Sequence, residues 1–459
     1  MVITREDFSG VVINAFAGLG FGKEAPFVEE FPDEMFRDGS DLTPIERNLD
    51  KIIYGLTKWE PRVKTKGKTT PQKVTVTGKD YVEAIDNMNN LFLRNLWSDG
   101  LPLIPPTEER VNWILRGTDL SPDTDIAKIL PRGGIASVKA LAICLAMAGG
   151  RPEYLPVLIA AVEAFTVPEF RHDWMNTTTG AVFPAVIVNG PIAKQIRINA
   201  GYGCLGPRPA YPAGGRIGRA IRLVLMCLGG GIAGINTMSI HGNNRYTNAV
   251  IAEDEAGLPP DWKPFSAESR GYAEGTNVVT VLPVNDIDRV MSPAVTTKEN
   301  MQRCVNEYVQ KILCVSQLTR YMGDEGGFVG MALMPRDMAG GFARLGFSRA
   351  GVQKLLWEKS ITPWATIESV INPTQRQMIM KGNPSVFVEG KPWPITARPE
   401  NIMVVVNGGA QSDHAAYLRQ GGASGYRVIS KEVKLPAKVK LDKLLKEAEL
   451  ALGPPSEDP

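Results

Sequence analysis

The sequence predicts an α/β protein in which mixed or parallel sheets are flanked by helices. Two apolar helical segments, 137–147 and 152–165, precede short buried strands that are expected at 185–188, 276–282 and 402–406. Strands that are apolar throughout are typical of sheets covered on both faces. Two of these strands end in Asn-Gly and a polar turn, which suggests two related α/β halves.

The composition is that of an ordinary globular protein. The 459 residues are 44% hydrophobic and 22% charged, which is enough chain for two or three domains. With 51 basic against 49 acidic residues, the chain has no electrostatic footprint for nucleic acid. The start of the chain lacks the pattern of a signal peptide, and the apolar stretches are too short to span a bilayer. We therefore expect a cytoplasmic protein that contacts neither nucleic acid nor membrane.

Residues 1–58 are expected to form a small N-terminal helical or α/β unit, followed by a linker at 59–76. Thr43-Pro44-Ile45-Glu46 matches a capping box with proline at the first helical position, and the helix runs to about Thr57. A unit of this size buries too little surface to be stable alone, so we expect it to dock on another polypeptide. The apolar face of its helix consists of Ile45, Leu49, Ile52, Ile53 and Leu56.

Residues 77–290 are expected to form the main α/β domain with the candidate site, and residues 291–437 a second α/β half. Residues 438–459 begin with an amphipathic helix and end in a tail. Thr107 is the expected cap of a short helix, and the prolines of 99–106 require an extended chain. The helices expected after the linker are 80–97, 107–115, 137–147, 152–165, 216–228, 300–318 and 345–357.

Cys204 is the candidate nucleophile or redox thiol. It lies in a glycine-rich loop, 201–207, and Arg208, Arg216 and Arg219 follow it. Nearby positive charge favours the thiolate, which is the reactive form of cysteine. The alternative is that Cys204 is a small residue filling a tight loop. The five cysteines form no close pairs of the kind found in disulfide frameworks or zinc modules.

Arg216, Arg219 and Arg222 recur at every third position near the start of a predicted helix that follows Gly214-Gly215. A helix N-terminus has free N–H groups and a positive dipole end, which suit a carboxylate or phosphate. Arg216 and Arg219 are therefore candidate substrate-binding residues. The alternative is an exposed arginine face, since neither a Walker loop nor a dinucleotide fingerprint accompanies them.

His172 and His241 are candidate acid–base residues, which Glu253, Asp254 or Glu255 could orient. A metal site built from His172, His241 and Glu253 is a second interpretation, because a two-histidine, one-carboxylate site can be assembled from distant positions. The spacing matches no compact metal motif, and no cofactor is predicted.

Four further side chains are candidate donors to a substrate oxygen, and turn capping is the alternative explanation for them. They are Asn176, Thr178, Asn189 and Asn243.

The proline- and glycine-rich motifs between residues 97 and 282 are Asp99-Gly100-Leu101-Pro102, 105–111, Pro131-Arg132-Gly133-Gly134, 147–157, Val188-Asn189-Gly190-Pro191 and 218–223. Together they resemble a bacterial family best known for a (seleno)cysteine-Gly-Ser-Cys motif. That family is distantly similar to the selenoprotein B component of glycine reductase. The family's own cysteine motif is absent from this chain, because no cysteine precedes Cys144.

Residues 15–22 and 45–57 resemble the closing part of the redox domain that carries the motif in fused relatives. The resemblance therefore implies that a separate small subunit carries the Cys/Sec-Gly-Ser-Cys motif. That subunit would complete the N-terminal unit, which otherwise exposes an apolar face, and the protein would be an oligomer.

Three functional hypotheses follow. The first is the large subunit of a thiol- or selenol-dependent lyase or reductase that acts on a carbon–heteroatom bond of a small anionic organic substrate. In it, Cys204 or a partner thiol is the nucleophile, and His241 or His172 transfers protons. The second is a metal-assisted hydratase or lyase using His172, His241 and Glu253. The third is a non-catalytic scaffold for a redox partner.

Overall fold

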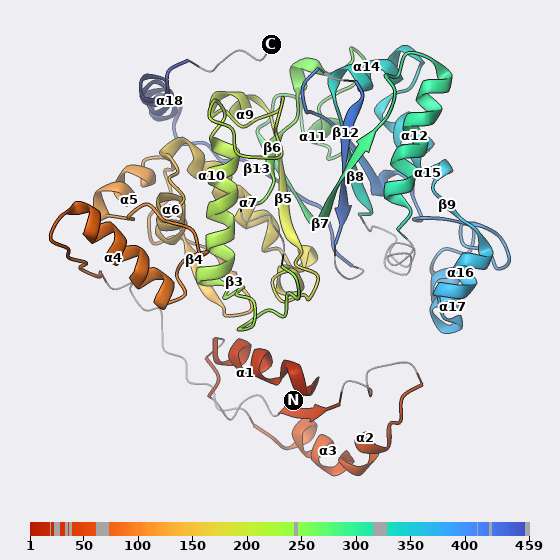
Figure 1. The fold of residues 1–459 in the computed structure, drawn as a ribbon, viewed down its shortest axis with the longest axis horizontal. Helices are drawn as coiled ribbons and strands as arrows, with labels where there is room; N and C mark the ends of the chain where they lie inside the picture. The colour runs from red at the N-terminus through yellow and green to blue at the C-terminus, as the bar shows by residue number, and fades with distance from the viewer. Residues whose placement is uncertain are drawn as a thin grey trace.

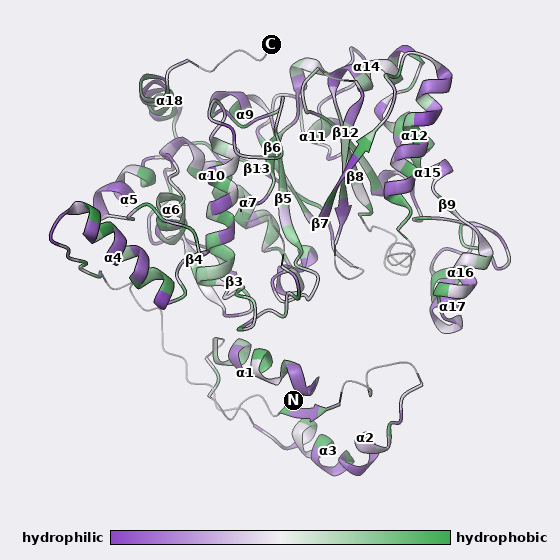
Figure 2. Cartoon of the chain, in the orientation of Figure 1, coloured by the Kyte–Doolittle hydropathy of each residue, from purple (hydrophilic) through white to green (hydrophobic). Residues whose placement is uncertain are grey.

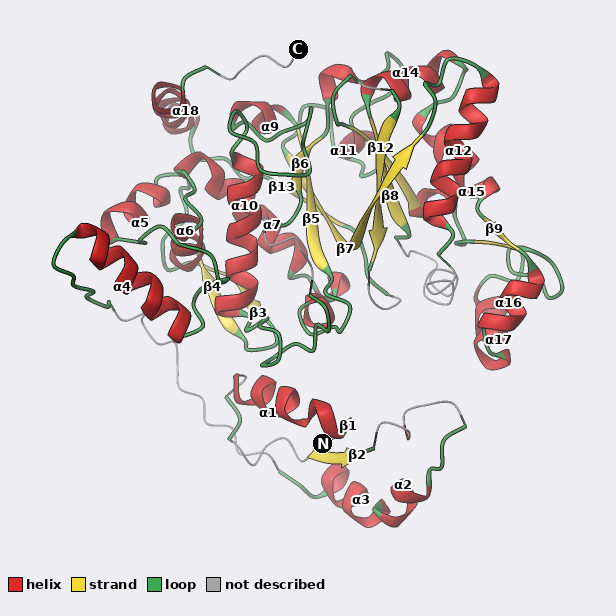
Figure 3. Cartoon of the chain, in the orientation of Figure 1, coloured by secondary structure: helices red, strands yellow, loops and turns green. Residues whose placement is uncertain are grey.

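Figure 1 shows a computed structural model in which a central group of strands lies between two groups of helices. The structure describes residues 1–18, 20–22, 28–32, 35, 39–60, 73–242, 247–314, 328–410, 412–421 and 425–454. Asn243, most of the expected linker and the end of the tail lie outside these residues. The α/β prediction is confirmed, with a mixed sheet flanked by helices (Figure 3). None of the described helices is long and apolar enough to cross a membrane.

The N-terminal unit is a small α/β unit. Strand β1 (Val2–Arg5) pairs in parallel with β2 (Val28–Phe31), and α1 (Ser9–Gly18) lies between them in the chain. The 3-10 helix η1 (Glu6–Phe8) precedes α1, and helices α2 (Thr43–Arg47) and α3 (Leu49–Thr57) follow β2. In Figure 1 the unit lies below the main body, and the Asn14 side-chain amide donates to the Ile235 carbonyl at 3.0 Å.

The predicted capping box at Thr43 is wrong. Thr43 lies inside α2 after the N-cap Leu42, which makes no side-chain cap. Instead, the Asp41 carboxylate accepts from the Thr43 backbone N–H at 2.9 Å, which is an Asx turn. The expected single helix is also divided at Asn48 into α2 and α3.

The first half of the main body begins with helices capped by their local sequence. Helix α4 (Tyr81–Arg94) has an Asp80 cap, α5 (Glu108–Leu115) has the predicted Thr107 cap, and α6 (Val138–Met147) has a Ser137 cap. The predicted turn at Pro131–Gly134 joins an antiparallel pair that the sequence did not predict. The remaining elements of this region are β3 (Asp125–Ile129), β4 (Gly134–Ser137), η3 (Pro152–Tyr154), α7 (Leu155–Phe165), η4 (Pro168–Phe170) and α8 (His172–Met175).

The central sheet has the order β11-β8-β12-β7-β5-β6, and β13 pairs with β7 beside this path. The pairs β5/β6 and β8/β11 are parallel, and the other pairs are antiparallel. The strands are β5 (Phe183–Asn189), β6 (Val250–Ala252), β7 (Val278–Met291), β8 (Gly330–Met334), β11 (Ile402–Val406), β12 (His414–Gln420) and β13 (Ile429–Glu432).

The two halves of this sheet share one topology. In each half, a first strand (β5 or β8) pairs in parallel with a second strand (β6 or β11) and antiparallel with a third (β7 or β12). The third strands pair with each other, so the strand order is palindromic. However, the two strands that end in Asn-Gly do not occupy equivalent positions. Strand β5 is the first strand of its half, whereas β11 is the second strand of the other half.

The helices of the second half pack against the part of the sheet that β8, β11 and β12 form (Figure 1). Helix α12 (Lys298–Ile312) ends earlier than expected, and α15 (Arg349–Lys359) begins after a Ser348 cap that the sequence did not predict. The C-terminal helix α18 (Lys438–Leu452) is confirmed, with Lys440 paired to Asp119 at 2.9 Å. The remaining elements are α9 (Pro191–Gln195), α10 (Ala213–Leu223), the π-helix η5 (Val224–Leu228), η6 (Glu255–Gly257), α11 (Phe265–Glu268), α14 (Arg336–Arg344), β9 (Ile361–Thr362), α16 (Trp364–Val370), α17 (Pro373–Gly382), β10 (Trp393–Pro394) and η8 (Pro399–Asn401).

Alternate strand residues face different apolar clusters. In β5, Val186 and Val188 pack with the helices of the first half, whereas Ala185 and Ile187 face a central cluster. That central cluster also contains residues of β8 and β11, so one face of the curled sheet encloses it. Its members include Ala185, Ile187, Met331, Leu333, Met403, Val405 and Cys204. Figure 2 shows that the central strands carry hydrophobic segments beside hydrophilic ones, as in β12, and that the outer helices have mixed colouring.

A buried ion pair joins the two halves. Glu253 follows β6, and its Oε1 accepts from the Arg349 guanidinium at 3.0 Å, with both side chains fully buried. Arg349 also donates to the Val404 carbonyl in β11 and pairs with Glu268 at 3.0 Å. Beside this pair, the Asp254 N–H donates to the Val406 carbonyl at 2.8 Å. The carboxyl ends of β6 and β11 are therefore held together.

We predict that Arg349→Met destabilises the protein by about 3–5 kcal/mol, because it leaves the Glu253 carboxylate buried without its cation. Urea unfolding followed by circular dichroism measures the change. The control is Arg303→Ala on α12, whose exposed pair with Glu299 should contribute less than about 0.5 kcal/mol. If Arg349→Met aggregates, Arg349→Lys keeps the charge and gives the measurable loss. A loss below about 1 kcal/mol for both Arg349 variants would contradict the prediction.

Candidate functional site

A cavity of ≈ 460 Å³ lies where the chain leaves β8 and β11 and enters β12. This volume is within the range of small-molecule sites, and the carboxyl ends of parallel strands are the usual position for such sites. The lining residues are Gly203, Cys204, Leu205, Gly206, Pro207, Arg289, Leu333, Pro335, Asn407, Gly408, His414, Ala415 and Ala416.

Two turns that come from distant parts of the chain form the wall around Cys204. The Gly408 N–H, which follows β11, donates to the Ala200 carbonyl at 2.8 Å. Gly409 has a φ of +89°, and a Cβ at this position would meet the Tyr202 ring at 2.9 Å. A side chain here would therefore push the two turns apart, and the close approach requires glycine. The loop that carries Cys204 is fixed against the end of β11 in this way.

The Cys204 thiol is buried and neutral. Cys204 is 8% exposed and belongs to the central cluster. Burial raises the pKa of the Cys204 thiol to about 12, although the backbone N–H groups of Cys204 and Leu205 act in the opposite direction. Arg208, which was expected to favour the thiolate, donates instead to the Tyr202 carbonyl at 3.1 Å. The expectation of a thiolate is therefore wrong for this chain by itself.

His414 is the histidine that lines the cavity, and sequence reasoning missed it. Its Nδ1 lies 3.0 Å from the Asp413 carboxylate, and the His414 side chain is 43% exposed. The hydrogen bond from His414 lowers the pKa of Asp413. Such a carboxylate partner fixes the orientation of an imidazole. The available signal was Asp413-His414 placed shortly after the Asn-Gly end of a predicted strand.

Arg289 and Asn407 are the other polar groups of the cavity that the sequence did not single out. Arg289 lies on β7 opposite Ala416 of β12. Within the described residues, the Arg289 guanidinium makes no hydrogen bond or ion pair. Asn407 is 2% exposed, and its Nδ2 is buried without a hydrogen-bond partner in the described chain. A buried unpaired amide donor is costly and needs an explanation.

His172, an expected acid–base residue, is engaged elsewhere. Its Nε2 accepts from the Leu130 backbone N–H at 3.2 Å, and its ring packs 6.4 Å from that of Phe165. Burial lowers the pKa of His172, so the neutral form that accepts this bond is favoured. His172 is not among the lining residues of the Cys204 cavity, and its contacts stabilise the turn after β3.

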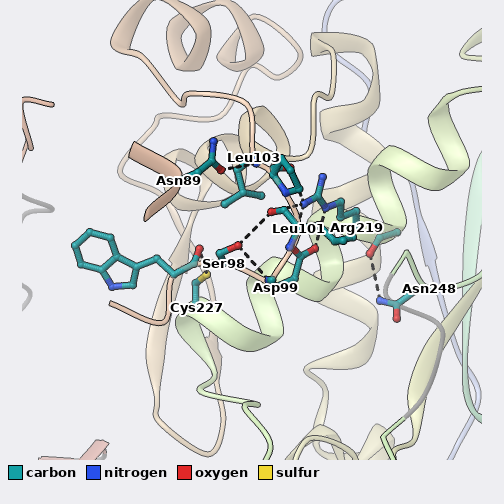
Figure 4. Close-up of polar contacts among 12 residues, drawn as sticks. Asn89, Ser98, Asp99, Leu101, Leu103, Arg219, Cys227 and Asn248 are labelled. Carbon is teal, nitrogen blue, oxygen red and sulfur yellow. Dashed lines mark hydrogen bonds and ion pairs between the residues drawn. The ribbon is translucent and has the colours of Figure 1, made fainter. Parts of the chain in front are cut away.

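Arg219 is used to hold the proline-rich segment at residues 99–102 (Figure 4). Its guanidinium binds both carboxylate oxygens of Asp99, at 2.8 and 2.9 Å, and the Leu101 and Pro102 carbonyls. The Asp99 carboxylate is almost completely buried. This bidentate pair occupies the donors that a substrate anion would need. The segment that carries the family resemblance is therefore fixed to α10 by Arg219.

The other expected arginines also lie away from the cavity. Arg216 is half-buried near Glu153 and Tyr154, where its charge lowers the pKa of both groups against the larger effect of burial. Burial lowers the pKa of Arg222, while Asp99 raises it. Neither arginine lines the Cys204 cavity. The start of α10 therefore faces the first half of the protein.

The side chains of Asn176 and Thr178 form hydrogen bonds with backbone groups and do not line the Cys204 cavity. The Asn176 amide donates to the Leu130 and Leu225 carbonyls at 2.8 and 3.1 Å. The Thr178 hydroxyl accepts from the Gly180 N–H at 3.2 Å, which is a turn contact. His241 is exposed and follows Ile240, whose N–H donates to the Thr179 carbonyl. His241 is outside the cavity lining, so the structure does not bring it to Cys204.

Asn189 and Glu253 lie together at the end of the first strand pair. The Asn189 Nδ2 donates to Glu253 at 2.7 Å and to Glu255 at 2.9 Å. Glu253 is thus occupied by Asn189 and Arg349. Within the described part of the chain, no three His, Cys, Asp or Glu side chains gather as a possible metal site. The metal-assisted interpretation stays a hypothesis.

Comparisons with known proteins gave no relative. No protein-family model matches this chain, and neither does any curated protein or solved structure. The resemblance to the (seleno)cysteine-Gly-Ser-Cys family therefore stays a prediction from short motifs.

We predict that Cys204 reacts slowly with iodoacetamide at pH 7 and faster as the pH rises toward 11. A pKa of about 12 keeps the thiol protonated at neutral pH, and only the thiolate reacts. Mass spectrometry of the peptide that contains Cys204 measures the rate at each pH. The same peptide in urea provides the control, since unfolding removes the burial. Rapid alkylation of the folded protein at pH 7 would contradict the prediction.

Proposed function

We propose that this chain is the large subunit of a thiol- or selenol-dependent enzyme that acts on a carbon–heteroatom bond of a small anionic organic substrate. The observation that carries the proposal is the cavity in which Cys204, His414, Arg289 and Asn407 meet at the carboxyl ends of β8 and β11. Apolar walls with a few convergent polar groups are the usual construction of a substrate site.

The neutral state of Cys204 supports a partner's thiol or selenol as the proposed nucleophile. Because burial raises the pKa of Cys204 to about 12, its thiolate is scarce at neutral pH. A thiol or selenol on the separate small subunit, with its Cys/Sec-Gly-Ser-Cys motif, is the nucleophile that the proposal requires. Cys204 then shapes the wall of the cavity, and His414 transfers the proton.

The proposed reaction is reductive cleavage by two partner thiols. The first thiolate forms a sulfur–carbon bond as the carbon–heteroatom bond breaks, and the leaving group takes a proton from the His414 imidazolium. The second thiol then attacks the first sulfur, so the carbon leaves with the electron pair and takes a proton. The two thiols are oxidised to a disulfide, and the substrate carbon is reduced.

We expect His414→Gln to lower the turnover of the two-subunit enzyme by roughly 100-fold, the usual contribution of a general acid. Cys204→Ser should lower it by less than about fivefold, because a neutral buried thiol is not the nucleophile. The assay follows product by NMR across a panel of small carboxylates with carbon–oxygen, carbon–nitrogen, carbon–sulfur and carbon–halogen bonds. Loss of turnover in Cys204→Ser with full turnover in His414→Gln would reverse the assignment.

The N-terminal unit is the proposed docking site for the partner. On α3, Ile52 is 7% exposed, whereas Leu49 is 50% and Leu56 is 69% exposed. The sheet next to it has only two described strands, β1 and β2, which is too few to cover an apolar face. Exposed apolar surface beside open strand edges is typical of a surface that pairs with another chain.

The position of this unit favours an arrangement in which the partner's thiol serves the cavity of a second copy. In Figure 1, β8 points toward α14 and the cavity end, while the N-terminal unit lies at the opposite end of the main body. A small partner bound on α3 is therefore far from the cavity of the same chain. We propose an oligomer in which the partner on one copy serves the cavity of its neighbour.

We expect Leu56→Asp to abolish co-purification of the small subunit, because it places a charge on the exposed apolar face of α3. Leu450→Asp on α18 is the matched control: Leu450 is also highly exposed, but it lies on a helix without a proposed partner. Affinity purification from the native cell followed by mass spectrometry measures the outcome. If both variants retain the same bound chains, α3 is not the docking site.

A further inference from the structure

Arg289 is a cation of the cavity that no described side chain neutralises. On the neighbouring strand, Arg419 pairs with Asp288, so the adjacent carboxylate is already engaged. Asp413 takes its hydrogen bond from His414, and Arg289 is not among the groups that lower its pKa. The Arg289 guanidinium has no hydrogen bond or ion pair with any described residue. Its planar fork of donors is complementary to a carboxylate.

Two further features at the cavity favour a negatively charged oxygen. Pro335 lines the cavity and is the N-cap of α14, a nine-residue helix, so the positive end of its dipole lies at the wall. Asn407 also lines the cavity, and its buried Nδ2 has no acceptor in the described chain. A ligand oxygen within reach of Nδ2 would remove the cost of this unpaired donor.

We propose that the cavity binds short aliphatic carboxylates, with Arg289 as the anchor for the carboxylate group. Asn407 holds a second ligand oxygen, and the apolar wall contacts the carbon chain. This inference names the substrate class of the proposed enzyme and rests on that proposed function. Arg289 takes the anchoring role that the sequence assigned to Arg216 and Arg219.

The remaining lining explains why a carboxylate fits better than a phosphate or a sugar. Sites for phosphates usually combine several cations with converging backbone N–H groups, and this cavity has one guanidinium. Sugars need many polar partners, whereas most of this wall is apolar. The apolar lining residues that the carbon chain would contact are Leu205, Pro207, Leu333, Pro335 and Ala416. A ligand with one carboxylate and a short aliphatic chain matches both the Arg289 guanidinium and the apolar lining residues.

The test is direct binding, measured by calorimetry or ligand-observed NMR on the full-length chain without any partner. The probes are propanoate and butanoate, with propanamide as the uncharged analogue and inorganic phosphate as the alternative anion. The variants are Arg289→Gln and, as the matched control, Arg303→Gln on the exposed face of α12. Because Arg289 is exposed, its replacement should leave unfolding by urea unchanged, which is checked in parallel.

We expect both carboxylates to bind, propanamide to bind at least tenfold more weakly, and Arg289→Gln to weaken carboxylate binding by roughly tenfold or more. Arg303→Gln should bind like the native protein. Equal binding of carboxylate and amide, tighter binding of phosphate, or unchanged binding in Arg289→Gln would each overturn the inference.

The outcome is separable from the proposed thiol chemistry. Carboxylate binding that depends on Arg289, combined with normal turnover in His414→Gln, would retain the anchor and reject the proposed reaction. The opposite result is thiol-dependent turnover that requires His414, with a carboxylate affinity that does not change in Arg289→Gln. That result would support the reaction and contradict the role of Arg289 as the anchor.

Discussion

The buried pair of Glu253 and Arg349 is the interaction on which the site depends. Glu253 follows β6, the second strand of the first half, and Arg349 is the first residue of a helix in the second half. Burial of this pair has a large desolvation cost, which is offset only when each ion has additional partners. Here Arg349 also binds Glu268 and the Val404 carbonyl, and Glu253 accepts from Asn189 and the Phe265 N–H. The pair therefore fixes how the two strand pairs meet.

The cavity forms because the two parallel strand pairs pack together in this way. The chain leaves β8 and β11 at the same edge of the sheet, and the turn after β11 is hydrogen-bonded to the segment before Cys204. The central cluster closes the other side. A space lined by groups from β7, β8, β12 and the turn after β11 is left at its margin. A weakened ion pair would move these turns relative to one another.

The electrostatics of the cavity are the reason why the proposed reaction uses a nucleophile from a second chain. Burial within the central cluster disfavours the Cys204 thiolate, whereas His414 and Arg289 lie at the more accessible rim. In the proposed enzyme, His414 and Arg289 would transfer a proton and bind an anion, and the activated nucleophile would come from the partner. The exposed apolar face of α3 offers a surface on which a partner with such a nucleophile could bind.

The sequence by itself determined the α/β class, most helices, the cap at Thr107, and the strands at 185–188, 276–282 and 402–406. These features depend on local periodicity and backbone hydrogen bonds. It also singled out Cys204. Only the tertiary structure decided which residues accompany Cys204. Arg219 and His172 are bound by groups 120 and 42 residues away, so their engagement cannot be seen in local spacing. Arg289, Asn407 and His414 reach the cavity because strand pairing and a buried ion pair bring distant strand ends together.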